Sequence, residues 1–194
     1  LIEETYSKLY PTCRHAQPAI ETALDLSEEM GFSLGDIRHV DVGTFQVAYD
    51  LTGKIMRPKN SGEAKFSIPY GIAVAVRERS FGTAHLTEAY YTDEELLRAA
   101  GKVCVRVAAD VQALYPKKRG AKLKVELNDG RTFERVCYDL KGSPDKPVGF
   151  AEIEKKFRAS AGGVFSGESV EKILALIAAL DDGASVRELM DVLG

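Results

Sequence analysis

The sequence predicts an α+β fold, in which an antiparallel sheet packs against helices and further helices follow at the C-terminus. Apolar and polar residues alternate over residues 103–107 and 122–127, which is typical of half-buried strands. Asn128-Asp129-Gly130 is a tight-turn sequence that pairs the second of these strands with residues 132–138 as a hairpin. Helical patterns are grouped and do not alternate strictly with the strands, so an antiparallel sheet with helices on one face fits better than a parallel, doubly wound sheet.

Length and composition indicate a folded globular protein. The chain has 194 residues, 45% hydrophobic and 28% charged, which suits one domain or one domain with an appended segment. We expect an α+β domain over residues 1–160, followed by a hinge and C-terminal helical segment over 161–194, because Ala161–Gly167 contains three glycines. The chain begins with Leu1 and not Met, which favours a processed product or a domain of a longer polypeptide.

Charge and cysteine usage exclude several classes of function. The net charge of −3 provides no overall positive field for nucleic acid or an anionic membrane, and no apolar run reaches the ~18 residues of a membrane span. Cys13, Cys104 and Cys137 lack the CxxC spacing of a zinc or redox site, so we expect a reducing, cytoplasmic setting. His39 and His85 have no metal-ligand spacing around them, so no metal site is predicted.

The first half of the chain predicts helices around one strand. Pro18 and Gly31 fit the first turn and the C-terminal cap of a helix over 17–30, and alternation over 36–44 predicts a strand that slips at His39. Residues 48–63, rich in Gly, Pro, Lys and Asn, predict a long loop of the kind that often binds ligands. A buried helix is expected near Pro69, and a capping box at Thr92 is expected to open a helix through Ala100.

The C-terminal third predicts helices alone. Residues 150–159 have helical spacing, Ser166 fits the N-cap of a second helix, and Ser185 opens a third with a capping box.

Three residues ahead of the first helix are the strongest candidates for chemistry. Lys8, Arg14 and His15 lie within eight residues of one another, and a helix N-terminus carries partial positive charge, so the group suits a carboxylate. The alternative is that both cations are solvated and His15 is an incidental neighbour of the helix. Lys117-Lys118-Arg119 is a basic run that we interpret as a solvated turn. These signals alone leave function open between an anion-binding module and a fragment of an enzyme.

Five segments in order resemble the C-terminal domain of the MmgE/PrpD family, which includes 2-methylcitrate dehydratase and cis-aconitate decarboxylase. The first is Lys-x-Tyr-Pro-x-Cys-Arg leading into a helix, and the second is Ala-Lys-Phe-Ser-x-x-Tyr. The others are a late strand, a Lys-Gly-x-Pro turn and a Lys-Phe helix. In this chain they are residues 8–14 with 18–23, 63–70, 127–130, 141–144 and 155–157.

The resemblance implies a fold and an activity. Members have a helical domain and a smaller α+β domain that closes over it, and they act on di- and tricarboxylic acids without metal or organic cofactor. The chain is then the substrate-covering domain of a lyase, most simply 2-methylcitrate dehydratase-like, and incomplete alone. Its partners would be the carboxylic-acid substrate, the N-terminal helical domain and a second copy in a homodimer. An epimerase or decarboxylase of the family, or a non-catalytic module that binds a polycarboxylate or partner protein, is the alternative.

The resemblance also assigns roles to residues. Lys8 occupies the position of a family active-site lysine, so we expect it to clamp a carboxylate and take part in catalysis. His15 is the second catalytic candidate, because the family often has His where this chain has Gln17. Substrate binding is expected from Lys8 together with Cys13, Arg14 and Lys65.

Overall fold

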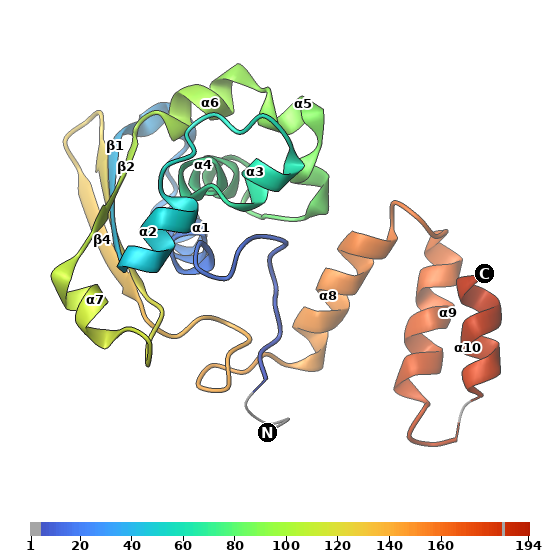
Figure 1. Ribbon diagram of the computed structural model, residues 1–194. Coiled ribbons are helices and arrows are strands. Elements are labelled where there is room, and N and C mark those ends of the chain that lie inside the picture. The colour runs from blue at the N-terminus through green and yellow to red at the C-terminus, as the bar shows by residue number, and fades with distance from the viewer. Residues whose placement is uncertain (1–4, 184) are drawn as a thin grey trace. The chain divides into compact units, whose positions relative to one another are not determined.

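The computed structural model describes residues 5–183 and 185–194. The chain divides into two compact units, Leu1–Pro147 and Val148–Gly194 (Figure 1). The helices are α1 Gln17–Met30, α2 Gln46–Thr52, α3 Ser61–Lys65, α4 Ile68–Glu78, α5 Glu88–Tyr91, α6 Glu94–Ala100, α7 Ala109–Leu114, α8 Phe150–Ala161, α9 Gly167–Ala178 and α10 Val186–Leu193, with 3-10 turns at Leu34–Asp36 and Thr83–Leu86. The strands are β1 Ile37–Thr44, β2 Val103–Val107, β3 Ala121–Leu127 and β4 Thr132–Cys137.

The α+β class is confirmed, and the sheet is mixed. Its strand order is β2-β1-β3-β4. The β1–β3 and β3–β4 pairs are antiparallel as predicted, whereas β1 and β2 run parallel, which corrects the expectation of an antiparallel sheet. The physical reason is the connection, since residues 45–102 form a helical crossover that returns the chain to the same end of the sheet. The slip predicted at His39 is a register shift between Ile37 and His39.

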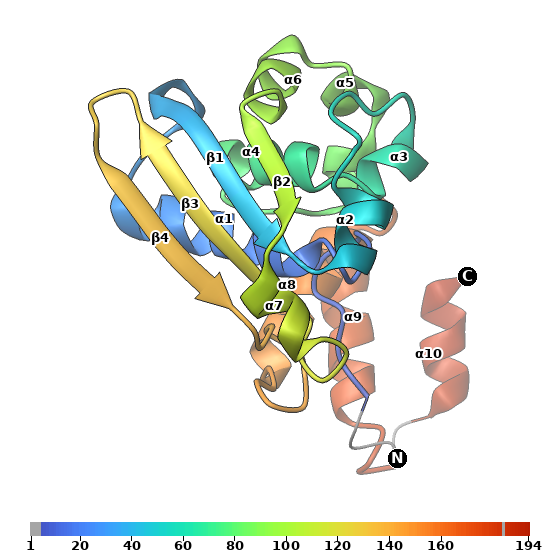
Figure 2. The same cartoon turned by 60° about the vertical axis from the view of Figure 1, so that its left-hand side comes forward.

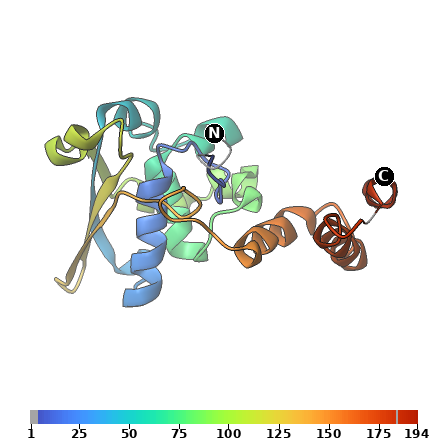
Figure 3. The same cartoon turned by 90° about the horizontal axis from the view of Figure 1, so that it is seen from below.

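Two helices cover one face of the sheet, as Figure 2 shows with α1 and α4 behind the strands. The side chains of Val40, Val42, Leu123 and Val125 point into this layer and are at most 2% exposed. Figure 3 shows α1 running beside the sheet when the first unit is seen from below. The opposite face carries charged residues, with Arg106 and Asp41 paired at 2.7 Å. Burial on one face therefore explains the alternating pattern of β3.

Helix α1 has the predicted bounds. Pro18 lies in its first turn, where the missing N–H is not needed, and Gly31 ends the helix in the left-handed conformation with φ 69°. The hairpin of β3 and β4 is confirmed, as are the helix near Pro69 and the N-cap role of Ser166, whose hydroxyl accepts from the Ser169 N–H.

The long loop predicted over residues 48–63 is wrong, because α2 and α3 occupy both of its ends. Ala48 lies in α2 and packs with Phe45, Ala108 and Val111 in a small apolar cluster. Ala64 of α3 is buried in the main core. Local composition favoured a loop, and burial of these alanines overrides it.

The cap of α6 is shifted by one residue from its predicted position. Asp93, and not Thr92, accepts hydrogen bonds from the backbone N–H groups of Glu95 and Leu96. The helix α7, between β2 and β3, was not predicted.

The second unit consists of α8, α9 and α10. Ala161, Val170 and Leu174 form its apolar centre, with Phe157 and Phe165 packed against them. Three apolar residues of α10 are exposed, Val186 at 63%, Met190 at 58% and Leu193 at 40%. Within the described residues, no helix is long and apolar enough to cross a bilayer.

Candidate functional site

The segment ahead of α1 is fastened at two points. The Ser7 N–H donates to the Gly142 carbonyl oxygen at 2.8 Å, and the Cys13 N–H donates to the Lys65 carbonyl oxygen at 2.8 Å. Gly142 has φ +84°, and a Cβ there would lie 2.1 Å from the Ser7 carbonyl oxygen, so the close approach requires glycine. These bonds bring distant parts of the chain to the entrance of α1.

Lys8 and Lys65 are cations with exposed side chains at this place. Lys8 directly follows the anchored Ser7, in a stretch that is neither helix nor strand. Lys65 is the last residue of α3, and its backbone holds Cys13, so the Cys13 and Lys65 that the sequence predicts are neighbours.

Arg14 is oriented by two contacts. Its Nη1 donates to Gln17 Oε1 at 3.0 Å, and its guanidinium lies 4.4 Å from the centre of the Tyr6 ring. Burial lowers the pKa of Arg14, but a guanidinium stays charged at neutral pH. Gln17 is 1% exposed, and its amide donates to the carbonyl oxygens of Tyr10 and Thr12. Gln17 therefore holds the turn that presents Arg14.

His15 is a half-buried imidazole whose Nδ1 is buried with no hydrogen-bond partner among the described residues. Its ring packs edge-on against Phe45, with centroids 5.3 Å apart. Burial, and then repulsion from Arg119 and Arg14, lowers the pKa of His15 below its ordinary 6.5. A neutral imidazole with an unpaired nitrogen can accept a proton or a hydrogen bond.

Arg119 is the residue that sequence analysis missed. It belongs to the basic run interpreted as a solvated turn, yet its charge acts on both Arg14 and His15. No local pattern signals this, because residues 116–119 approach the entrance of α1 only through the tertiary fold.

A pocket of about 260 Å³ opens beside Arg14. Tyr6 and Arg14 form one wall, the turn 116–119 a second, and parts of the segment 138–145 a third. Lys118 is paired with Asp139 and Asp145 across it. The cations of this pocket therefore differ in how far they are neutralised.

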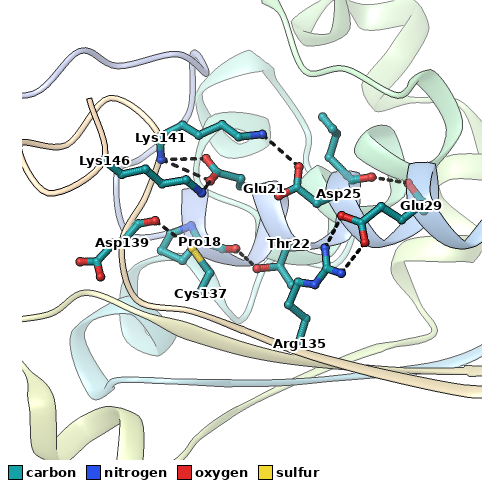
Figure 4. Close-up of polar contacts among 12 residues, drawn as sticks. Pro18, Glu21, Thr22, Asp25, Glu29, Arg135, Cys137, Asp139, Lys141 and Lys146 are labelled. Atoms are coloured by element: carbon teal, nitrogen blue, oxygen red, sulfur yellow. Dashed lines mark hydrogen bonds and ion pairs between the residues drawn. The ribbon is translucent and has the colours of Figure 1, made fainter. Parts of the chain in front are cut away.

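Behind the site, α1 is tied to the segment after β4 by a line of charged residues (Figure 4). Glu21 is 1% exposed, lies 3.3 Å from Lys146 Nζ and accepts from the Lys141 backbone N–H, while Asp25 pairs with Lys141 Nζ at 3.1 Å. These lysines have acidic partners, so they stabilise the fold in place of binding a substrate. The nearby Cys137 thiol has a pKa of about 11, raised by burial and by Glu21, and is not a nucleophile at neutral pH.

In the part of the chain that the structure describes, no three His, Cys, Asp or Glu side chains gather as metal ligands.

Comparison with known proteins decides the family. The sequence model described as MmgE/PrpD C-terminal domain matches residues 10–182. The chain belongs to the MmgE/PrpD family. The resemblance seen in the sequence is therefore confirmed, and the match covers most of the chain.

Two relatives of this MmgE/PrpD domain are named as enzymes. Alkylcitrate dehydratase phiI of Talaromyces stipitatus is 24% identical over 202 residues, which cover 98% of this chain and 42% of the relative. Cis-aconitate decarboxylase-like protein oryM of Aspergillus oryzae is 38% identical over 71 residues, 37% of this chain and 14% of the relative. The domain thus spans about two fifths of the dehydratase's length.

Three of the five family segments of this MmgE/PrpD domain meet at one place. The segment 8–14 contacts the segment 63–70 through Cys13 and Lys65, and its neighbour Ser7 contacts the turn 141–144 through Gly142. The late turn at 128–130 lies at the other end of β3, and the Lys-Phe pair belongs to α8 in the second unit. Segments that are separate in sequence therefore build one corner around the N-terminus of α1.

Proposed function

We propose that this domain is the substrate-covering part of a lyase that acts on a di- or tricarboxylic acid without a cofactor, most simply a 2-methylcitrate dehydratase-like enzyme. The observation that carries the proposal is the corner where Arg14 and His15 lie beside the N-terminus of α1 and next to the segment held by Lys65. Cations and the partial positive charge of a helix N-terminus together favour a carboxylate. The names of the two relatives point to the same class of substrate.

The residues of this corner have distinct proposed roles. Lys8, Arg14 and Lys65 hold substrate carboxylates, and the Cys13 backbone keeps the binding segment in place. Removing a proton beside a carboxylate develops negative charge, which nearby cations stabilise. His15 is the proposed proton acceptor, because its lowered pKa keeps the imidazole neutral at pH 7.

The proposed partner is the N-terminal helical domain of the same enzyme. The chain spans about two fifths of the dehydratase relative, so a complete enzyme of that length contains much that is not present here. We assign the missing acid and base groups to the helical domain, and we place the complete enzyme in the cytoplasm as a homodimer.

Decarboxylation is the second candidate reaction. The relative with the higher identity over its matched stretch, 38%, is named as cis-aconitate decarboxylase-like. Both reactions pass through a carbanion-like centre beside a carboxylate, so the same corner serves either one.

The test compares the complete enzyme with the 194-residue chain. We expect the complete enzyme to convert 2-methylcitrate with loss of water, and the chain alone to show no turnover, because cations without a full acid and base set cannot stabilise the transition state selectively. Release of carbon dioxide from cis-aconitate by the complete enzyme would favour the second candidate. Turnover by the isolated chain, or no turnover of any di- or tricarboxylic acid by the complete enzyme, contradicts the proposal.

A further inference from the structure

We propose that Arg119 is a specificity-determining residue that binds one carboxylate of a tricarboxylic acid, in the pocket it shares with Arg14. The inference rests on the proposed function and adds to it a residue from outside the family segments.

Two cations of the turn 116–119 differ in whether they form ion pairs. Lys118 is paired with both Asp139 and Asp145, which fixes it against the opposite wall. Arg119 lines the same pocket and is exposed, and it has no ion pair or hydrogen bond among the described residues. Its five N–H donors are therefore open to a ligand that enters the pocket.

Cations outnumber carboxylates in this pocket, since Asp139 and Asp145, both paired with Lys118, are the acidic residues of its lining. Arg14 and Arg119 both line it, and each lowers the pKa of His15 by repulsion. The N-terminus of the 14-residue helix α1 adds partial positive charge beside Arg14. An anion between the guanidinium groups relieves the repulsion, and the planar guanidinium matches a carboxylate with two parallel hydrogen bonds.

The backbone of the turn is held at both ends, which fixes where the Arg119 side chain starts. Tyr115 stacks on Phe45 with ring centroids 4.6 Å apart, and the same Phe45 ring packs against His15. At the other end of the turn, the Thr44 hydroxyl donates to the Gly120 carbonyl oxygen at 3.2 Å in a buried position. Arg119 lies between these two fixed points, and preorganisation reduces the entropy cost of binding.

The arrangement favours an acid with at least three carboxylates. Arg119 lines the pocket together with Arg14, whereas Lys8 and Lys65 lie outside its lining, near the segment that leads into α1. A substrate whose other carboxylates are held by Lys8 and Lys65 can bind Arg119 only through a further carboxylate. Arg119 thus distinguishes a tricarboxylic from a dicarboxylic acid.

The test measures binding of unreactive acids to the complete enzyme by calorimetry. The ligands are tricarballylate and two dicarboxylates, glutarate and methylsuccinate. Each dicarboxylate corresponds to tricarballylate without one of its three carboxylates. Arg119→Gln should weaken tricarballylate binding by at least ~10-fold, as for loss of a charge-assisted hydrogen bond. For the dicarboxylate that lacks the carboxylate bound by Arg119, the same substitution should change the affinity by less than about threefold. The matched control is Arg98→Gln, since Arg98 is an exposed α6 arginine with no ion pair among the described residues.

Each outcome decides the point. No binding of tricarballylate by the unmodified enzyme, equal effects of the Arg119 and Arg98 substitutions, or an equal loss for all three ligands overturns the assignment of Arg119. Because calorimetry needs no turnover, these results do not depend on the reaction. Absence of turnover with every carboxylic acid instead contradicts the proposed function, so the two failures are distinguishable.

Discussion

Replacing Gly142 by alanine tests whether the contact between Ser7 and the turn 141–144 supports the site. An alanine at φ +84° carries a left-handed strain of about 1–2 kcal/mol. The new Cβ would also lie 2.1 Å from the Ser7 carbonyl oxygen, and a backbone atom cannot rotate away as a side chain can. The Ser7–Gly142 hydrogen bond must then break, which adds about 0.5–1.5 kcal/mol.

The functional effect should exceed the effect on stability. Breaking this contact releases the stretch that contains Lys8, so the complete enzyme should lose at least ~10-fold in kcat/KM, the value of one charge-assisted hydrogen bond. Gly130→Ala is the matched control. Gly130 has φ +88° and nothing within 4 Å of its would-be Cβ, so the control has the same strain without the clash.

The assay is kcat/KM of the complete enzyme together with the midpoint of its thermal unfolding. We expect both variants to unfold at a lower temperature than the unmodified enzyme, and only the Gly142 variant to lose activity. If both variants keep full activity, or both lose it equally, the anchoring of Ser7 has no role in the site.

Two further predictions concern the proposed catalytic residues. Lys8→Ala should lower kcat/KM of the complete enzyme by at least ~10-fold with little change in the midpoint of thermal unfolding. The control is Lys124→Ala, on the charged outer face of the sheet, which should change neither quantity. Equal activities of the two variants would show that Lys8 does not bind a substrate carboxylate. Because burial lowers the pKa of His15, activity that needs its neutral form should persist as pH falls to 6.5 and be lost below it. The free energy of unfolding should also fall below pH 6.5, because His15 of the unfolded chain takes up a proton at a higher pH than His15 of the folded chain. An acidic limb of kcat/KM above pH 6.5, or an unchanged limb in His15→Gln, contradicts this role.

Local signals in the sequence predicted the elements that local interactions determine. Helix α1 has Pro18 in its first turn and Gly31 at its end, and the hairpin of β3 and β4 has a tight turn at 128–130. In both cases the residues that fix the structure lie within the element, so one window of sequence contains the whole cause.

Non-local contacts determine what the sequence could not predict. Alternation indicates that 103–107 is a strand, but nothing in it says that β2 runs parallel to β1, because direction depends on the crossover between them. Arg119 is exposed, as interpreted from the sequence, but its position near His15 could not be predicted for the same reason. Its place near His15 depends on the stack of Tyr115 on Phe45, and these two residues are far apart in sequence.

The candidate site was predictable in part, through the segment 8–15, because its members are close in sequence and precede a helix. Lys65 was included through the family resemblance, and the backbone bond to Cys13 supplies the structural reason for its proximity. Whether these residues bind substrate stays a prediction. The burial of Glu21 by Lys141 and Lys146 had no signal in sequence, since a glutamate inside a helix is ordinarily exposed.

The exposure of the site's cations gives a physical reason why a covering partner matters for the proposed reaction. Lys8, Lys65 and Arg119 are exposed, so water screens a carboxylate placed beside them. Two unit charges 4 Å apart attract by only about 1 kcal/mol in water, but by about 4 kcal/mol at the effective dielectric constant of a protein surface. A helical domain that excludes water from this corner would therefore strengthen every one of these contacts without moving a residue of this domain. On this argument the cations bind weakly in the isolated chain and stabilise developing charge only in the complete enzyme.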